Sequence, residues 1–147
     1  MKKYTLTKEK KVQFGITLFR IKANVAFGII AKGELGGWIE KEDNLDQSGD
    51  AWVYGDAWVS DDARVYGDAC VYGDAWVYGD ARVYGDARVY GDARVYGDAW
   101  VYGDARVYGD ARVYGKTKCE VGFYFGYIEK DEKIIEIQEE DGILLKK

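Results

Sequence analysis

The sequence predicts an all-β protein whose chain winds into a solenoid, and two features of its repeat support this. Residues 49–114 are eleven consecutive copies of one six-residue phrase, Gly-Asp-Ala-x-Val-Tyr, interrupted only at Ser60 and Asp61. A short, regular period is typical of a solenoid, in which each repeat packs on its neighbours. The phrase also separates a strand, Ala-x-Val, from a corner, Gly-Asp.

The hexad determines which side chains face inward. Successive side chains of a strand point to opposite faces, so Ala and Val share the inner face, while x and the following Tyr point outward. Gly tolerates the positive φ of a sharp corner, and Asp can hydrogen-bond nearby backbone there. Three hexads, or eighteen residues, would close one triangular turn. We therefore expect Val83 and Val89 inside the coil and Arg88 outside it.

This pattern resembles the hexapeptide repeat of left-handed parallel β-helices. Ala57, Ala63 and Ala69 occupy the small position, and valines two residues later occupy the aliphatic one. The stretch 33–45, Gly-Glu-Leu-Gly-Gly-Trp-Ile-Glu-Lys-Glu-Asp-Asn-Leu, leads into Gly49–Tyr54 and is similar to the start of the YdcK-like group of bacterial and phage proteins. The resemblance covers roughly residues 3–115. It implies a single-stranded left-handed β-helix of about four rungs.

Many left-handed β-helix proteins are acyl or sugar-nucleotide transferases, and resemblance to those enzymes would imply a catalytic histidine at a trimer interface. This chain has no histidine. Acid–base chemistry would fall on Asp or Glu, and the repeat places its carboxylates in equivalent corners rather than in one convergent pocket. We therefore expect a protein that is not an enzyme, with no catalytic residue and no cofactor.

The remaining sequence suggests a cap at each end of the coil. Residues 1–48 form an N-terminal β cap and lead-in, 49–121 the hexapeptide β-helix, and 122–147 a C-terminal β-hairpin cap. Short strands are predicted at 4–7, 11–14 and 17–21, and a hairpin at 123–128 and 133–138 that turns at 130–132. We expect the apolar residues near the C-terminus, 143–145, to pack on the cap or on a partner. The expected apolar lid of the N-terminal cap comprises Leu18, Phe19, Ile21, Val25, Phe27, Ile29 and Ile30.

The 147 residues suffice for one domain, and no apolar run is long enough to cross a membrane. The polar start after Met1 does not resemble a secretion signal, so a cytoplasmic location is expected, in the host cell if a phage encodes the protein. Cys70 occupies an outward position and Cys119 an inward one, which makes them poor disulfide partners. Two cysteines without histidine also disfavour a zinc site.

Acidic side chains are concentrated in the coil. Residues 49–115 contain twelve Asp and six Arg, a net charge of −6, while the whole chain carries −5, so the remainder carries +1. With an eighteen-residue turn, these Asp form corner columns whose like charges repel. Solvent and neighbouring arginines, or alternatively bound calcium, would relieve this repulsion. Calcium prefers six or more oxygen ligands and each corner supplies one carboxylate, so we expect no metal.

The outward x positions give each wall a composition of its own. Sorted by eighteen, they are Trp52, Cys70, Arg88 and Arg106 on a first wall, Trp58, Trp76, Arg94 and Arg112 on a second, and Arg64, Arg82, Trp100 and Lys118 on a third. Two interpretations remain open. These rings and guanidinium groups stack on one another across adjacent strands, or they bind a partner, because Trp, Tyr and Arg dominate interface hot spots. The candidate interface residues are Trp52, Tyr72, Arg88, Tyr90, Trp100 and Arg106.

The break in the repeat predicts a notch on the second wall, where Ser60 stands in place of a tyrosine. A planar group could stack between Trp58 and Trp76 there, with an acceptor and a cation beside it. Drift in a tandem array is the alternative explanation of the break. The candidate ligand-binding residues are Trp58, Ser60, Asp61, Trp76, Tyr78 and Arg94.

Two functions are therefore considered. The first is an interaction scaffold that docks proteins, first of all another copy of itself, as a homo-oligomeric dimer or trimer. The alternative is a phage-encoded sequestering protein that holds a small anionic aromatic molecule, such as a signalling nucleotide, to block host defence. Neither requires a membrane, and the absence of long basic stretches gives no reason to expect a nucleic-acid partner.

Overall fold

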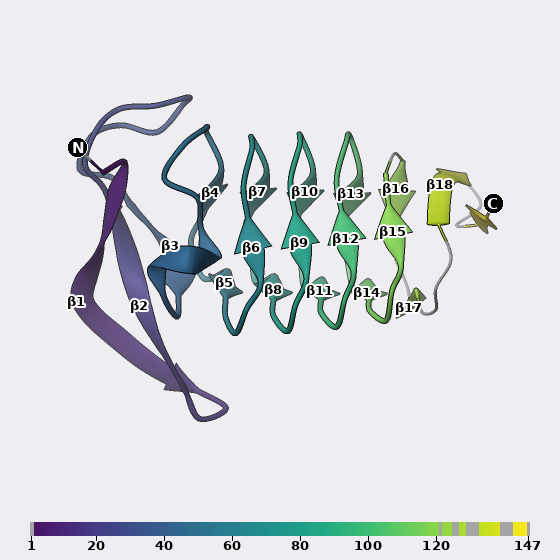
Figure 1. Ribbon diagram of the computed structural model, residues 1–147, viewed down its shortest axis with the longest axis horizontal. Helices are drawn as coiled ribbons and strands as arrows, with labels where there is room; N and C mark the ends of the chain where they lie inside the picture. The colour runs from purple at the N-terminus through teal and green to yellow at the C-terminus, as the bar shows by residue number, and fades with distance from the viewer. Residues whose placement is uncertain (1, 121, 125–126, 129–132, 139–142, 147) are drawn as a thin grey trace.

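The computed structural model describes residues 2–120, 122–124, 127–128, 133–138 and 143–146. Short parallel strands stack along the long axis of the molecule in three walls, and the N-terminal strands lie at one end (Figure 1). The first wall has five strands, one for each turn, so the protein is a β-solenoid of about five turns rather than four. The predicted all-β solenoid is confirmed.

Each wall is one sheet of strands that lie eighteen residues apart in the repeat. The first wall comprises β4 (Trp52–Val53), β7 (Cys70–Val71), β10 (Arg88–Val89), β13 (Arg106–Val107) and β16 (Phe123–Tyr124). The second comprises β3 (Leu35–Ile39), β5 (Trp58–Val59), β8 (Trp76–Val77), β11 (Arg94–Val95), β14 (Arg112–Val113) and β17 (Tyr127–Ile128). The third comprises β6 (Arg64–Val65), β9 (Arg82–Val83), β12 (Trp100–Val101), β15 (Lys118–Cys119) and β18 (Lys133–Gln138).

The strand register matches the expected sorting by eighteen. Arg88 pairs with Cys70 on one side and Arg106 on the other, and Trp76 lies between Trp58 and Arg94. Backbone bonds link successive turns, as where the Trp76 N–H donates to the Ala93 carbonyl at 3.0 Å. Equivalent positions of the hexad therefore stack in columns along the repeat.

The interior of the coil is filled by the Ala and Val of every hexad. All of these side chains from Ala51 to Val113 are fully buried. Cys119 takes the place of a valine opposite Val101 and is also buried, whereas Cys70 lies outside and half-buried. Both thiols are free, in agreement with their assignment to opposite faces.

Glycine is required at the corners for two reasons. Gly67 has a φ of +68°, a region that residues with a Cβ rarely adopt. A Cβ at this position would also lie 3.0 Å from the backbone nitrogen of Gly85 in the next turn. The close stacking of the turns and the backbone conformation of the corner therefore both favour glycine here.

The N-terminal cap is an antiparallel hairpin joined to the second wall. β1 (Tyr4–Gln13) pairs with β2 (Ile16–Ala23), and β2 pairs with β3, which begins the parallel stack. The two short strands predicted at 4–7 and 11–14 are one strand, because the register shift between Leu6 and Lys10 absorbs the polar segment that was expected to separate them. A short 3-10 helix, η1 (Glu42–Asn44), precedes Leu45, which bridges to Val65 at the start of the third wall.

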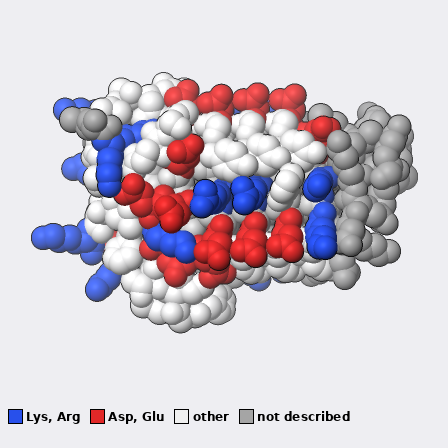
Figure 2. Space-filling view, in the orientation of Figure 1, with Lys and Arg blue, Asp and Glu red and all other residues white. Residues whose placement is uncertain are grey.

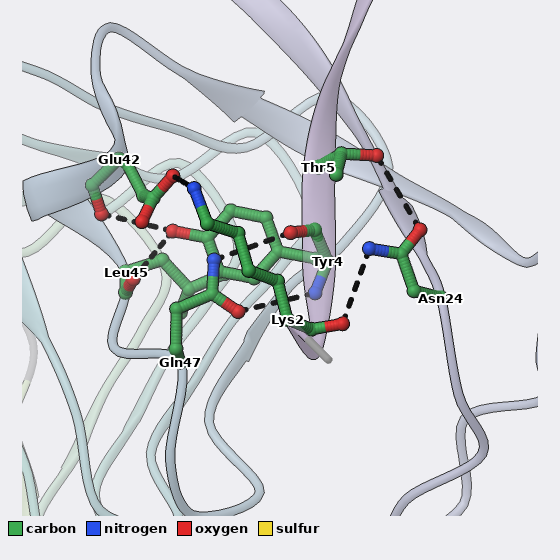
Figure 3. Close-up of polar contacts among 7 residues, drawn as sticks. All are labelled: Lys2, Tyr4, Thr5, Asn24, Glu42, Leu45 and Gln47. Atoms are coloured by element: carbon green, nitrogen blue, oxygen red, sulfur yellow. Dashed lines mark hydrogen bonds and ion pairs between the residues drawn. The ribbon is translucent and has the colours of Figure 1, made fainter.

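Polar contacts hold the first strand to the end of the coil (Figure 3). The Tyr4 hydroxyl shares its proton between the carbonyls of Glu42 and Leu45. The Gln47 side-chain amide accepts a hydrogen bond from the Tyr4 N–H and donates one to the Tyr4 carbonyl. The Lys3 ammonium donates to the Ala51 carbonyl at 2.9 Å, and burial lowers the pKa of Lys3. These bonds satisfy polar groups at a coil end that would otherwise be unpaired.

The apolar lid is only partly as expected. Leu18, Ile21 and Ile30 are buried, whereas Ile29 is 88% exposed, because it lies in a turn between Phe27 and Ile30, which form their own bridge. The lid covers Trp52, whose ring lies 5.3 Å from that of Phe27 and 6.2 Å from that of Tyr4. Trp52 is thus fully buried although its position faces out of the coil.

The C-terminal segment differs from the predicted hairpin. β16 and β17 do not pair with β18; each continues a wall in parallel, and the expected turn at 130–132 lies outside the described residues. Tyr124, which is buried, pairs with Val107, and Ile128 pairs in register with Val113, so the coil gains a turn without Gly-Asp corners. A hairpin does follow, between β18 and β19 (Ile143–Lys146). The side chains of residues 143–145 lie outside the described part of the structure, so their packing stays a prediction.

Candidate functional site

The predicted notch residues lie along one row of the second wall, under the tip of the β1–β2 hairpin. The rings of Trp58 and Trp76 are in contact, with centroids 4.5 Å apart and planes tilted by 51°. The guanidinium of Arg94 lies 4.0 Å from the ring centre of Trp76, a cation–π contact. Phe14, from the hairpin tip, approaches both indoles at 6.4 and 5.2 Å.

The direct contact between the two indoles corrects one expectation. A planar molecule stacked between two rings needs roughly twice the stacking distance, and Trp58 and Trp76 leave no such space. Trp58 is only 3% exposed, because it lies beneath the hairpin and packs with Leu18 and Trp38. With the indoles in these positions, no planar group fits between them.

Ser60 changes the stack of rings that follows each strand of this wall. Tyr78, Tyr96 and Tyr114 form a ladder with centroids 4.9 and 5.1 Å apart and nearly parallel planes. At the position of Ser60 the ladder lacks a tyrosine, and the Trp58 ring extends it, 6.4 Å from Tyr78 and tilted by 16°. Burial raises the pKa of Tyr78. The Ser60 side chain is fully buried, and its hydroxyl has no hydrogen-bond partner among the described residues.

Asp61 replaces a corner glycine and has a φ of +58°. Its carboxylate accepts a hydrogen bond from the Gly79 N–H at 3.1 Å, and its own N–H donates to Glu40 Oε1 at 2.6 Å. Asp tolerates this conformation better than most residues, and the bond to the next turn compensates part of the strain. Asp61 therefore serves the corner and does not line the notch, contrary to expectation.

A cavity of about 280 Å³ remains on the side of the Trp row that faces the tyrosine ladder. Five of the six predicted ligand-binding residues line it, together with two residues of the hairpin. The lining residues are Phe14, Ile16, Trp58, Ser60, Trp76, Tyr78 and Arg94. The structure thus brings the notch residues together, apart from Asp61, around a space different from the one expected.

A second cavity, of about 400 Å³, lies on the opposite side of the same row. It is polar, because the corner carboxylates of the repeat line it with Lys11 and Gln13 of β1. Its lining residues are Lys11, Gln13, Asp56, Trp58, Asp74, Trp76, Asp92 and Arg94. The Trp58–Trp76–Arg94 row therefore separates an aromatic cavity from an acidic one.

The residues of the hairpin tip could not be assigned to this site from the sequence. Phe14 and Ile16 lie some forty residues before the notch, and only the folding of the hairpin onto the wall brings them there. Phe14 at a tight turn is the one local indication. It has a φ of +50° and is 75% exposed, a conformation and an environment unusual for a large apolar residue.

The candidate interface residues are divided between walls. Tyr72 and Tyr90 stack on each other with centroids 4.9 Å apart, and Arg88 and Arg106 form a row beside them. Trp52 belongs to this wall but is covered by the cap, so it is not available to a partner. On the third wall, Lys118 lies 4.6 Å above the ring of Trp100. Cross-strand stacking, the first of the two interpretations, is thus present on all walls.

Burial also affects a tyrosine of the first wall. The pKa of Tyr54 is raised to about 12, chiefly by burial and then by neighbouring Cys70. Burial likewise raises the pKa of the Cys70 thiol, although Arg88 acts in the opposite direction. Neither group is therefore activated as a nucleophile at neutral pH.

The third wall presents stripes of alternating charge. In Figure 2 two rows of acidic side chains run along the coil, with basic side chains between them. The sequence of the wall accounts for this: Asp62, Asp80 and Asp98 precede its strands, Arg64 and Arg82 lie on them, and Asp68, Asp86 and Asp104 follow. Between the basic row and the second acidic column, Tyr66, Tyr84 and Tyr102 stack at 4.8 and 5.1 Å.

Within the described part of the chain, no group of three or more Cys, Asp or Glu side chains is arranged to hold a metal ion. Each acidic column contributes one carboxylate per turn, so the negative charges are distributed along the coil and are not concentrated at one point. No helix among the same residues combines the length and the apolar character of a membrane span.

Comparison with known proteins identifies the repeat. The family model described as the YdcK β-solenoid repeat matches residues 63–79, 87–103 and 105–117. No curated protein matches the chain. The matched segments lie within the coil, on strands of all three walls, and the stacked parallel turns have the architecture that the repeat describes. The coil of this chain therefore carries the YdcK β-solenoid repeat and is similar to that group of proteins.

Proposed function

We propose that the protein is a non-enzymatic scaffold whose walls dock other proteins, first of all a second copy of itself. The observation that carries this proposal is the charge pattern of the third wall, where columns of Asp flank a row of Arg at the constant spacing of the turns. The carboxylates are distributed along columns rather than gathered at one point, which suits recognition of an extended surface better than catalysis.

The stripes determine how two identical walls can face each other. A two-fold axis parallel to the coil, between the Asp62–Asp80–Asp98 column and the Arg64–Arg82 row, places the acidic column of each copy over the basic row of the other. A two-fold axis across the coil would instead bring like charges together, which is unfavourable. The proposed dimer is therefore isologous, with parallel coils.

Charge reversal on this wall tests the proposal. Arg82→Glu and Asp80→Arg should each weaken the dimer by about ten-fold or more, because each places like charges opposite one another. The double variant Asp80→Arg/Arg82→Glu exchanges the two charges and should restore it. Arg88→Glu on the first wall is the matched control and should leave the dimer unchanged. Sedimentation velocity at several salt concentrations measures the association, which should weaken with added salt.

A second candidate function is sequestration of a small anionic aromatic molecule. The aromatic cavity beside Ser60 and Arg94 favours it, whereas the contact between Trp58 and Trp76 disfavours the nucleotide intercalated between those rings. A phage origin and a signalling nucleotide as ligand belong to this candidate. Calorimetric titration with cyclic and linear nucleotides tests it, and an absence of heat with the whole panel would exclude that ligand class.

A further inference from the structure

We infer that the cavity beneath the tip of the β1–β2 hairpin is a binding site for a small aromatic anion, of one or two fused rings bearing a carboxylate or a similar group. This inference deepens the sequestration candidate and is independent of docking through the third wall. The volume of the cavity, about 280 Å³, lies just below the range of typical ligand pockets, about 300–1,000 Å³, and suits a molecule of this size.

The walls of the cavity favour an aromatic ligand. Phe14, Trp58, Trp76 and Tyr78 present rings to it, and Ile16 completes the apolar part of the lining. Rings packed against such surfaces gain both apolar burial and edge or face contacts. Ser60 supplies no ring to the Tyr78 ladder, so the Trp58 ring takes the next place in the stack, 6.4 Å from Tyr78, and the cavity lies beside these two rings.

Ser60 supplies a polar group that the fold leaves without a partner. Its side chain lines the cavity and is fully buried, yet its hydroxyl has no hydrogen-bond partner among the residues that the structure describes. A buried hydroxyl without a partner is destabilising, and proteins rarely retain one without a reason. An acceptor oxygen on a molecule in the cavity would satisfy it.

Arg94 supplies the positive charge. Its guanidinium stacks on Trp76 at 4.0 Å, and it has no ion pair with any described carboxylate. Asp74 and Asp92 line the acidic cavity on the other side of the same row. An anion is therefore repelled from that side and attracted to the aromatic side, where the guanidinium can offer two parallel N–H donors to a carboxylate.

The hairpin tip forms the outer wall of the cavity. Phe14 adopts a φ of +50° while its ring reaches Trp58 and Trp76, and strained backbone of this kind clusters at functional sites such as ligand clamps. Asn or Gly would suit the turn better. The ring is thus placed where it closes the cavity, at the expense of local backbone strain.

Calorimetric titration of the full chain with 2-naphthoate, and with its uncharged analogue 2-naphthamide, tests the site. The unmodified protein should bind 2-naphthoate at least about ten-fold more tightly than 2-naphthamide, because only the carboxylate pairs with Arg94. Arg94→Gln should remove that preference. Ser60→Ala should weaken 2-naphthoate binding about three- to ten-fold by removing one hydrogen bond. Arg88→Gln, outside the cavity on the first wall, is the matched control and should bind like the unmodified protein.

Ser60→Tyr restores the residue of the repeat and should abolish binding by filling the cavity. Circular dichroism establishes that each variant is folded, and the Arg94→Gln result stands independently if Ser60→Tyr does not fold. The inference is overturned if the unmodified protein does not bind 2-naphthoate, or if folded Arg94→Gln and Ser60→Tyr bind it as tightly as the unmodified protein. Sedimentation of the same samples reports self-docking separately, so failure of one proposal is distinguishable from failure of the other.

Discussion

The side of the wall on which a repeat residue lies determines whether its side chain is buried or exposed. Val89 and Arg88 are adjacent in sequence, yet the first is fully buried and the second is exposed. Val89→Asp should destabilise the coil by more than about 4 kcal/mol, because it buries a charge without a partner. Arg88→Asp should change the free energy of unfolding by less than about 1 kcal/mol. Urea denaturation measures both, and similar effects of the two substitutions would refute the assignment of the faces.

Cys119 allows a pH test of burial at one position. Burial raises the pKa of its thiol above the ordinary value of 9.0. Below pH 9 the thiol is protonated in both states, so its contribution to stability is fully present there. As pH rises above 9, only the unfolded chain ionises, and stability falls. Between pH 8 and 10, the unmodified protein should lose about 1.4 kcal/mol more than Cys119→Val, measured by denaturant unfolding. Equal losses would show that this thiol is accessible in the folded state.

The corners are the elements that keep the turns in contact. Gly85 has a φ of +67°, and an added Cβ would lie 2.8 Å from the backbone nitrogen of Gly103, whereas Gly55, with a φ of +57°, has open space at that point. Both Ala substitutions incur backbone strain of about 1–2 kcal/mol. Gly85→Ala should be more destabilising than Gly55→Ala by at least about 1 kcal/mol, because it also separates two turns.

Thermal unfolding of these two glycine variants provides the comparison. A larger effect of Gly55→Ala would contradict the stacking of corners in adjacent turns. Asp61 shows that a corner of the repeat can accept a residue with a Cβ, since it already replaces glycine at a φ of +58°.

The sequence predicted elements best where the hexad is intact. The alternation of Ala-x-Val and the Gly-Asp corner predicted the three walls and the register from β4 to β15, because those preferences are local. The turn formed by β16, β17 and β18 was missed because Tyr124 and Ile128, which pair in register with valines of the preceding turn, are not separated by Gly-Asp. The burial of Trp52 and Trp58 could not be predicted either, since it depends on how a hairpin distant in sequence packs on the wall.

In the candidate site, too, the repeat spacing predicted which residues share a wall, but it could not predict contacts made by segments distant in sequence. The row of Trp58, Trp76 and Arg94 followed from the eighteen-residue spacing, and the structure brings it together with Ser60 and Tyr78. Asp61 was misplaced because its role as a substitute for a corner glycine directs its carboxylate to Gly79. Phe14 was missed because a turn that folds back over a wall leaves no periodic pattern in the sequence.

At the scale of the whole molecule, the long repeat makes its walls straight and its charges periodic. Each intact turn adds one Asp to each of three columns and two outward side chains, x and Tyr, to each wall, so these walls present a partner with rows of side chains rather than a single patch. Rows of opposite charge favour one relative orientation of two copies, and the stacked tyrosines keep the surface between them uniform. We therefore expect a dimer with parallel coils.

Native mass spectrometry of the full chain at low micromolar concentration distinguishes this dimer from a monomer. We expect a principal species of twice the chain mass of 16.6 kDa, which dissociates when Arg82 is replaced by Glu and reforms in the Asp80→Arg/Arg82→Glu variant. If only the 16.6 kDa monomer is observed under conditions that preserve known weak dimers, the protein does not dock to itself through this wall.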